Sequence, residues 1–125
     1  MKLTENFSKS EFECKCGCKM PKNIEDNVKK LAIQLQIIRD IVNVPIKINS
    51  GYRCEKHNSR IKGSSKNSQH LKGKAADIVI KGYDPILKTF PLLDQLVEEG
   101  ELIIGGMGKY STFTHIDIRK NRARW

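Results

Sequence analysis

One stretch decides the fold: residues 68–80 read Ser-Gln-His-Leu-Lys-Gly-Lys-Ala-Ala-Asp-Ile-Val-Ile. Small and β-branched residues fill its second half, 75–80, which predicts a strand buried inside the protein. A carboxylate within such a strand must be paired or bound to a cation, and Asp77 is in that position. Gly73 leaves little bulk between His70 and Asp77, so the loop can fold back and bring the imidazole over the carboxylate. The stretch therefore predicts two donors of one metal site.

A second imidazole and a second carboxylate lie close together in the segment 113–119, where residue types alternate. The alternation predicts a strand with His115 and Asp117 on the same face. With His70 and Asp77, His115 makes a set of two imidazoles and one carboxylate. Zinc bound by three such ligands keeps a fourth position open for water. The alternative for both histidines is a hydrogen-bonded polar residue without a metal.

The region before the buried strand is expected to contribute one long helix and one short strand. Apolar residues recur every three or four positions up to Val42 and predict an amphipathic helix, for which Asn23 is the candidate N-cap. Ile46 and Ile48 alternate with polar residues and predict a strand that ends in a turn. The polar segment 55–67 is expected to be a surface loop.

The region after the buried strand is expected to hold a second helix and another strand. Asp84, with a proline behind it, starts a predicted helix over 84–100, which Pro91 is expected to kink or divide. Residues 102–104 are a candidate strand. The Gly-Gly-Met-Gly segment at 105–108 is expected to be flexible.

Length and composition indicate a globular protein with a single core. At 125 residues we expect one domain over 1–125, which includes a Cys-rich N-terminal loop at about 13–22. No segment is long and apolar enough to cross a bilayer, so no membrane partner is expected. The start of the chain lacks the apolar run of a signal peptide, and we expect synthesis in the cytoplasm and exit by a separate route.

The net positive charge of the chain indicates which kinds of partner it could bind. A formal charge of +9 favours an anionic partner such as nucleic acid, a membrane surface or the polymers of a bacterial wall. The alternative is a solvated basic surface, because the lysines are scattered along the chain. No helix is dense in basic residues and few aromatic residues are present to stack bases, so nucleic acid is not expected. We expect a monomer.

The four cysteines form a second group of potential ligands. Cys14, Cys16 and Cys18 lie in the N-terminal loop, and Cys54 directly follows Arg53. Thiolates from two loops can enclose a structural zinc ion. The alternatives are a disulfide between Cys54 and one of the other three, or free thiols. A reducing compartment would weigh against the disulfide.

Three motifs follow one another along the chain: Ser-Gly-Tyr-Arg at 50–53, Ser-x-His-x-x-Gly-x-Ala-x-Asp at 68–77, and Phe-x-His-x-Asp-x-Arg at 113–119. Together they resemble the zinc D-Ala-D-Ala carboxypeptidase family, peptidase family M15, which shares its fold with the hedgehog signalling domain. The resemblance covers about residues 7–125 and is nearest to the branch that contains small phage endolysins. It implies an α+β fold in which helices pack on an antiparallel sheet that carries the zinc site.

The resemblance also implies a function and a set of ligands. His70, Asp77 and His115 are similar to the zinc ligands of the family, and the implied substrate is the peptide stem of bacterial peptidoglycan. An amide bond would be cut, either as a carboxypeptidase or as an endopeptidase of the endolysin type. The alternative is a catalytically inactive, zinc-containing module of the same fold that binds the cell wall.

The general base departs from the family pattern. In better characterised branches an acid three residues before the last histidine serves as the base, and here that position is Thr112. Asp117 is the candidate in its place, because it shares a strand face with His115. The alternative role for Asp117 is to orient His115 or to pair with Arg119.

Substrate binding is expected at Arg53, which resembles the family arginine that holds a substrate carboxylate. Its guanidinium matches a carboxylate with two parallel hydrogen bonds. The alternatives are packing over Tyr52 or pairing with a surface acid. Ser68 and Gln69 are candidates for hydrogen bonds to the substrate or for shaping the loop. His57 is expected at the rim and not as a ligand.

Overall fold

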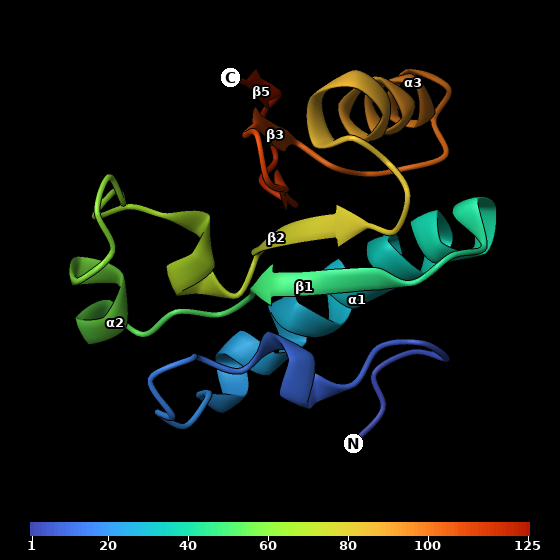
Figure 1. The fold of residues 1–125 in the computed structure, drawn as a ribbon. Coiled ribbons are helices and arrows are strands. Elements are labelled where there is room, and N and C mark those ends of the chain that lie inside the picture. Colours follow the sequence, from blue (N-terminus) through green and yellow to red (C-terminus); the bar gives the residue numbers. More distant parts are fainter.

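The computed structural model describes all residues, 1–125, and its centre is a five-stranded sheet in the order β1-β2-β4-β3-β5 (Figure 1). The strands are β1 Ile46–Ser50, β2 Ala75–Ile80, β3 Gly106–Lys109, β4 Thr114–Asp117 and β5 Ala123–Arg124. All neighbouring pairs are antiparallel except β3 and β5, which are parallel. The prediction of an α+β fold is confirmed, with a mixed sheet in place of a purely antiparallel one.

Six helical segments surround the sheet. They are η1 Lys9–Phe12, α1 Lys22–Val42, α2 Glu55–Ser59, η2 Gln69–Lys72, η3 Pro85–Thr89 and α3 Phe90–Glu98. Figure 1 shows α1 running along β1 and β2, with α3 beside β3 and β5. None of these helices combines the length and apolar character needed to traverse a bilayer.

The core joins one face of α1 to the sheet. A cluster of 22 buried residues includes Val28, Leu31 and Leu35 from α1, together with Ile78 from β2 and Ile116 from β4. The three- and four-residue spacing on α1 directs these aliphatic side chains to one side of the helix. Burial of this stripe is what holds the helix against the strands.

Four local predictions need correction. Helix α1 begins at Lys22 after Pro21, so Asn23 lies in the first turn and is not the cap. The expected loop 55–67 contains α2. The strand predicted at 102–104 is absent, and the glycine-rich segment expected to be flexible forms β3 instead.

The reason for a strand in the glycine-rich segment is packing. A Cβ atom on Gly106 would collide with the carboxylate of Asp117, and one on Gly108 would lie 2.6 Å from the Trp125 indole nitrogen. Glycine has low strand propensity, but only glycine lets β3 approach these side chains. The kink or division expected at Pro91 is not a break: the π-helical η3 continues directly into α3 at Phe90, and Thr89 and Phe90 both keep right-handed helical backbone angles.

Candidate functional site

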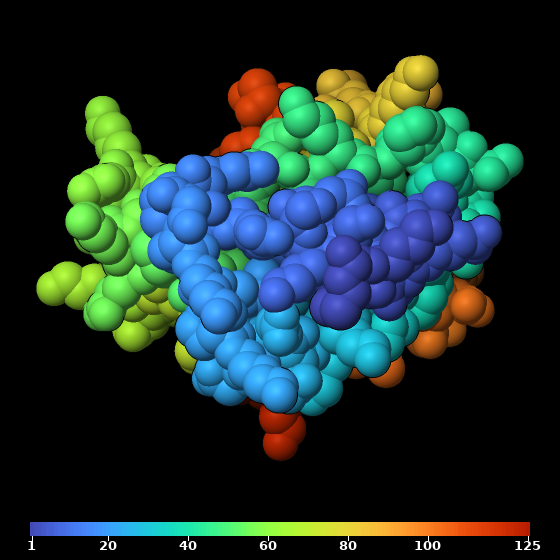
Figure 2. Space-filling model, turned by 90° about the horizontal axis from the view of Figure 1, so that it is seen from below, coloured from blue at the N-terminus to red at the C-terminus, as the bar shows by residue number.

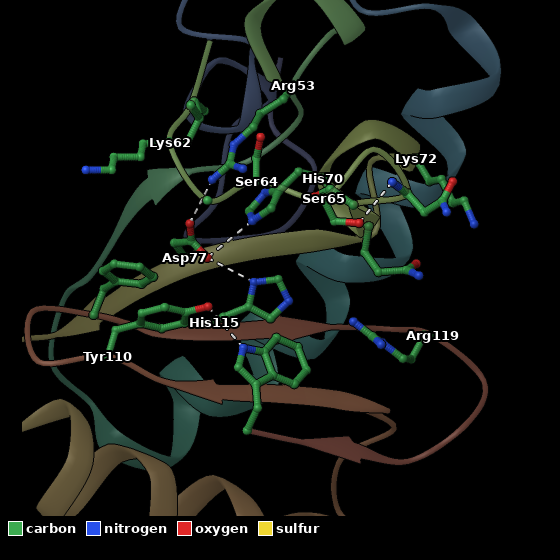
Figure 3. A pocket seen from close by; sticks show the side chains of 17 residues that line it. Arg53, Lys62, Ser64, Ser65, His70, Lys72, Asp77, Tyr110, His115 and Arg119 are labelled. Atoms are coloured by element: carbon green, nitrogen blue, oxygen red, sulfur yellow. Dashed lines mark hydrogen bonds and ion pairs between the residues drawn. The ribbon is translucent and has the colours of Figure 1, made fainter. Parts of the chain in front are cut away.

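The two central strands bring the predicted metal ligands together. In the register of β2 and β4, Asp77 lies directly opposite His115, and the two side chains share one face of the sheet. His70 reaches the same point from η2. The chain then reverses at Gly73, which has the positive φ of 69° that disfavours other residues. The potential ligand atoms of His70, Asp77 and His115 all lie within 4.8 Å of one another (Figure 3).

One carboxylate oxygen is the meeting point of the site. Asp77 Oδ1 lies 3.2 Å from His70 Nε2 and 3.1 Å from His115 Nδ1. All three side chains are buried. Asp77 Oδ2 accepts a hydrogen bond from Arg53 Nη2 at 3.2 Å. The carboxylate therefore faces two imidazoles on one side and a guanidinium on the other.

The outer nitrogens of both imidazoles determine what the inner ones present to Asp77. His70 Nδ1 lies 2.7 Å from the carbonyl oxygen of Gly51, which can only accept, so this nitrogen carries the proton. His115 Nε2 donates in the same way to Asp117 Oδ2 at 2.8 Å. In their neutral forms both rings then point a lone pair at Asp77 Oδ1. Three acceptors that converge in this way fit a divalent cation, which all of them can bind.

The electrostatics of these side chains also favour a cation at this point. Burial would raise the pKa of Asp77, but its contacts with His115 and His70 outweigh burial and hold that pKa well below its usual range. Burial would lower the pKa of His115, but its contacts with Asp117 and Asp77 outweigh that effect and raise it. The site therefore keeps its carboxylate ionised and attracts positive charge.

Asp117 lies behind His115, on the far side of the ring from Asp77. Its side chain is fully buried, and both oxygens are occupied. Oδ1 accepts from the backbone of Gly106 and from the backbone and Nε of Arg119, and Oδ2 accepts from Arg119 Nη2 and His115 Nε2. Burial would raise the pKa of Asp117, but the bonds from His115 and Arg119 hold it well below the usual range. This arrangement favours the orienting role over that of a general base.

A cavity of about 790 Å³ opens above the three candidate ligands (Figure 3). Four of its lining residues are basic: Arg53, Lys62, Lys72 and Arg119. The only carboxylate in its lining is Asp77. Much of the remaining wall is polar and comes from residues 63–68, which lie between α2 and η2, and from Gln69 at the start of η2. A cavity of this kind suits a polar ligand that carries negative charge.

Arg53 lies beside Asp77, on the turn that follows β1. Ser50 is paired with Asp77 across the end of the strand, so the turn that follows lies beside the carboxylate. Arg53 Nε donates to Ser50 Oγ at 3.1 Å, and Nη1 donates to Asn58 Oδ1 at 3.4 Å. With the bond to Asp77, three of its five N–H groups are used and two remain for a ligand.

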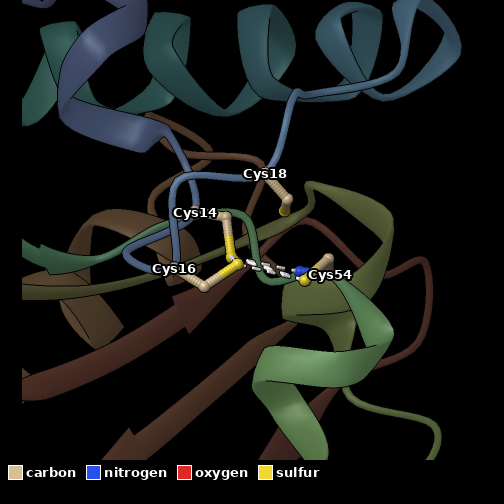
Figure 4. Close-up of side chains that lie close together, drawn as sticks. All are labelled: Cys14, Cys16, Cys18 and Cys54. Atoms are coloured by element: carbon tan, nitrogen blue, oxygen red, sulfur yellow. Dashed lines mark hydrogen bonds between the residues drawn. The ribbon is translucent and has the colours of Figure 1, made fainter.

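Of the other residues considered in the sequence analysis, some line the cavity and the rest lie outside it. Ser68 and Gln69 both line the cavity, and Ser68 Oγ accepts a hydrogen bond from the backbone N–H of His70, which supports η2. His57 lies on α2, outside the cavity lining and outside the metal-ligand group. The four cysteines gather at a separate place, between the N-terminal loop and the start of α2 (Figure 4).

An aromatic wall of the cavity was missed by the sequence analysis. The rings of Tyr110 and Phe113 stack with centroids 4.4 Å apart, and Trp125 Nε1 donates to the Tyr110 hydroxyl at 3.0 Å. The Trp125 ring also lies 5.0 Å from that of His115. Tyr110 and Phe113 flank the turn between β3 and β4, so a correct β3 would have placed them. Trp125 depends on the two-residue β5, which has no local sequence signal.

Comparison with known proteins identifies the family. No match was found among curated proteins. A family model described as Peptidase M15 matches residues 5–117, which contain the first two motifs, the third motif as far as Asp117, and all three candidate ligands. This match confirms the resemblance drawn from the sequence. The chain therefore belongs to peptidase family M15, the zinc-dependent metallopeptidases.

Proposed function

We propose that the protein is a zinc-dependent peptidase that hydrolyses amide bonds in the peptide stems or cross-links of bacterial peptidoglycan. The observation that carries the proposal is the convergence of His70, Asp77 and His115 on one point at the floor of a basic cavity. The family match over residues 5–117 supports it. A place of action at the bacterial wall, reached by release of the phage-lysis type, belongs to the same proposal.

His70 Nε2, Asp77 Oδ1 and His115 Nδ1 would hold the zinc ion. Zinc bound there would polarise the scissile carbonyl and make water a stronger nucleophile at neutral pH. The protein contributes the orientation of the ligands. Gly51 holds the His70 ring by its carbonyl oxygen, and Asp117 holds the His115 ring by its carboxylate.

Asp117 acts in this proposal as a positioning residue. Its carboxylate accepts hydrogen bonds on both oxygens, and it does not line the cavity in which a substrate would bind. A base must come within hydrogen-bond reach of the proton that it removes, and Asp117 is separated from the cavity by the His115 ring. The negative charge of Asp117 makes His115 a stronger donor to the metal.

The basic residues of the cavity would bind the carboxylates of a stem peptide. Arg53 has two N–H groups without an intramolecular partner, enough for a two-point bond to one carboxylate. Lys62 and Lys72 add positive charge at the cavity wall. Ser68 and Gln69 offer polar groups for the peptide backbone. The Tyr110 and Trp125 rings would cover the apolar side of a D-alanine.

A second candidate function is a zinc-containing module that binds the cell wall without cutting it. The observation that favours it is the cavity lining, in which Asp77 is the only carboxylate and is itself a candidate ligand. Thr112, at the family position of the base, cannot accept a proton at neutral pH. Under this alternative the zinc ion and Arg53 would hold the stem peptide as a ligand.

Digestion of defined muropeptides would decide between the two functions. Zinc-loaded protein is incubated with purified stem peptides and cross-linked dimers, and the products are identified by mass spectrometry. Loss of a terminal D-alanine indicates a carboxypeptidase, and new amine ends within the stem or cross-link indicate an endopeptidase. His70→Ala is the inactive control, and His57→Ala is the matched histidine control. Retention on peptidoglycan without any new product would select the binding module, and neither retention nor cleavage would overturn both proposals.

A further inference from the structure

We propose that Cys14, Cys16, Cys18 and Cys54 bind a second, structural zinc ion that ties the N-terminal loop to the turn carrying Arg53. The four thiols meet outside the catalytic cavity, and none of them lines it (Figure 4). Metal binding by these four thiols can be measured without the peptidase reaction, so this proposal can fail separately from the proposed function.

The distances between the sulfur atoms are close to those of a tetrahedral site. Sγ of Cys16 lies 3.2 Å from that of Cys14 and 3.4 Å from that of Cys54, and the Cys14 and Cys54 sulfurs are 3.8 Å apart. Cys18 completes a group whose ligand atoms all lie within 4.8 Å of one another. Zn–S bonds of about 2.3 Å in a tetrahedron place the sulfurs about 3.8 Å apart. Four thiolates fill every position of zinc, which is the arrangement of structural sites.

Backbone N–H groups already point at two of the sulfurs. The N–H of Cys54 donates to Cys14 Sγ at 3.4 Å, and the N–H of His57 donates to Cys54 Sγ at 3.4 Å. The loop is tightened by a turn in which the Gly17 N–H donates to the Cys14 carbonyl at 3.0 Å. Such donors stabilise the thiolate form that binds metal and orient its lone pairs.

The arrangement fits zinc better than the alternatives. Sγ of Cys16 is close to two other sulfurs at once, so the group is not one pair with two spectators. A disulfide between Cys54 and any one of the three would leave two thiols crowded against it. Tetrahedral S4 sites suit zinc or iron, and four cysteines around one ion are a common ligand set of structural zinc sites.

An ion at the cysteine cluster would link the N-terminal segment to the turn 51–53. The Tyr52 N–H donates to the Phe12 carbonyl at 2.8 Å, and a Cβ on Gly51 would lie 2.7 Å from the Phe12 Cα, so the N-terminal segment is pressed against the turn 51–53. That turn carries Arg53, and its Gly51 carbonyl holds His70. Figure 2 shows the N-terminal residues lying across this side of the molecule. A zinc ion on the cysteines would thus hold in place the segment that positions Arg53 and His70.

Metal analysis of the protein purified under reducing, anaerobic conditions tests the proposal. Wild-type protein is expected to hold two zinc ions per chain. His70→Ala should keep one, and after cobalt exchange it should show the intense thiolate-to-cobalt absorption of a tetrathiolate site. Cys16→Ser should lose that absorption, whereas the neighbouring exposed Lys15→Ser should keep it. A single zinc in the wild type without the thiolate signature, or iron in place of zinc, would overturn the proposal.

A measurement on the wild-type chain covers the case in which a cysteine variant does not fold. Alkylation of each thiol is followed by mass spectrometry with and without a strong chelator. All four thiols, the exposed Cys16 included, are expected to react about tenfold or more faster once zinc is removed. Rates that do not respond to the chelator, or a disulfide detected between any two of the four, would contradict the site.

Discussion

The two groups of potential ligands in this protein differ in what holds them in place. His115 and Asp77 lie on neighbouring central strands, and their distance is set by sheet register. The cysteines come from two irregular segments, one before α1 and one at the start of α2, where no strand pairing holds them. The first group is formed by the fold alone. The second is formed by two loops, and we propose that a zinc ion holds these loops together.

The groups also differ in number of donors and in access. Three donors lie under an open cavity at the sheet, whereas four gather away from it. Three ligands leave a position for substrate chemistry, and four leave none. In the two proposals, the number of donors and their access to a cavity therefore distinguish the catalytic metal site from the structural one. Each prediction below tests one side of this contrast.

The largest effect is expected for His70→Ala. Removal of one of three ligands should abolish binding of the catalytic zinc, and loss of a Lewis acid worth several kcal/mol should lower kcat/KM about a thousandfold or more. Muropeptide turnover measures it. His57→Ala, on α2 and outside the cavity, should stay near wild type. Equal losses in both variants would show that the imidazole at position 70 has no special role.

Metal removal should destabilise the protein mainly through the cysteines. Zinc at a thousandfold excess over its Kd stabilises the folded state by about 4 kcal/mol. Chelation should lower the free energy of unfolding in wild type and in His70→Ala alike, since both retain the cysteine group. Cys16→Ser should be much less sensitive to the chelator. Urea unfolding with and without chelator gives the comparison, and a chelator effect lost only in His70→Ala would reverse the assignment of roles.

Asp117→Asn should weaken the catalytic site without destroying it. The amide keeps an oxygen for the His115 Nε2 proton but loses the charge, and changes to such orienting partners weaken metal affinity about 10- to 100-fold. Excess zinc is therefore expected to restore most of kcat. A loss of kcat that persists at saturating zinc would return Asp117 to the role of general base. Equilibrium zinc titration provides the affinity.

A smaller effect is expected for Arg53→Lys. Lysine keeps the charge but cannot bond Ser50, Asp77 and a substrate carboxylate together, because it lacks the planar fork. Loss of one charge-assisted bond, worth about 1.5–3 kcal/mol, should reduce kcat/KM about 10- to 150-fold. Arg60→Lys, at an exposed position after α2, is the matched control. Unchanged kinetics in Arg53→Lys would remove the arginine from substrate binding.

Local sequence patterns predicted the elements in which the same kind of residue recurs at regular positions facing the core. The apolar spacing on α1 and the small and β-branched residues around Asp77 in β2 each carry their own signal. His115 and Asp117 were placed on one face by alternation alone, and their hydrogen bond agrees. In each of these cases the pattern reflects contacts with a single layer of the core.

Elements that depend on distant partners were missed. Strand β3 exists because Gly106 fits beside the Asp117 carboxylate, and β5 exists because it pairs with β3. Neither contact has a signal within the segment itself. The same holds for Trp125, which reaches the cavity only through β5.

By itself, the sequence determined the family, the α+β class and the identity of the candidate ligands, because ligand chemistry and strand periodicity are properties of nearby residues. Only the tertiary structure decided what those ligands do to one another. The role of Asp117 depended on which atoms surround it, and the convergence of Cys54 with the N-terminal cysteines depended on how two loops meet. Such contacts join residues far apart in the chain, and their free energy arises only when the chain has folded.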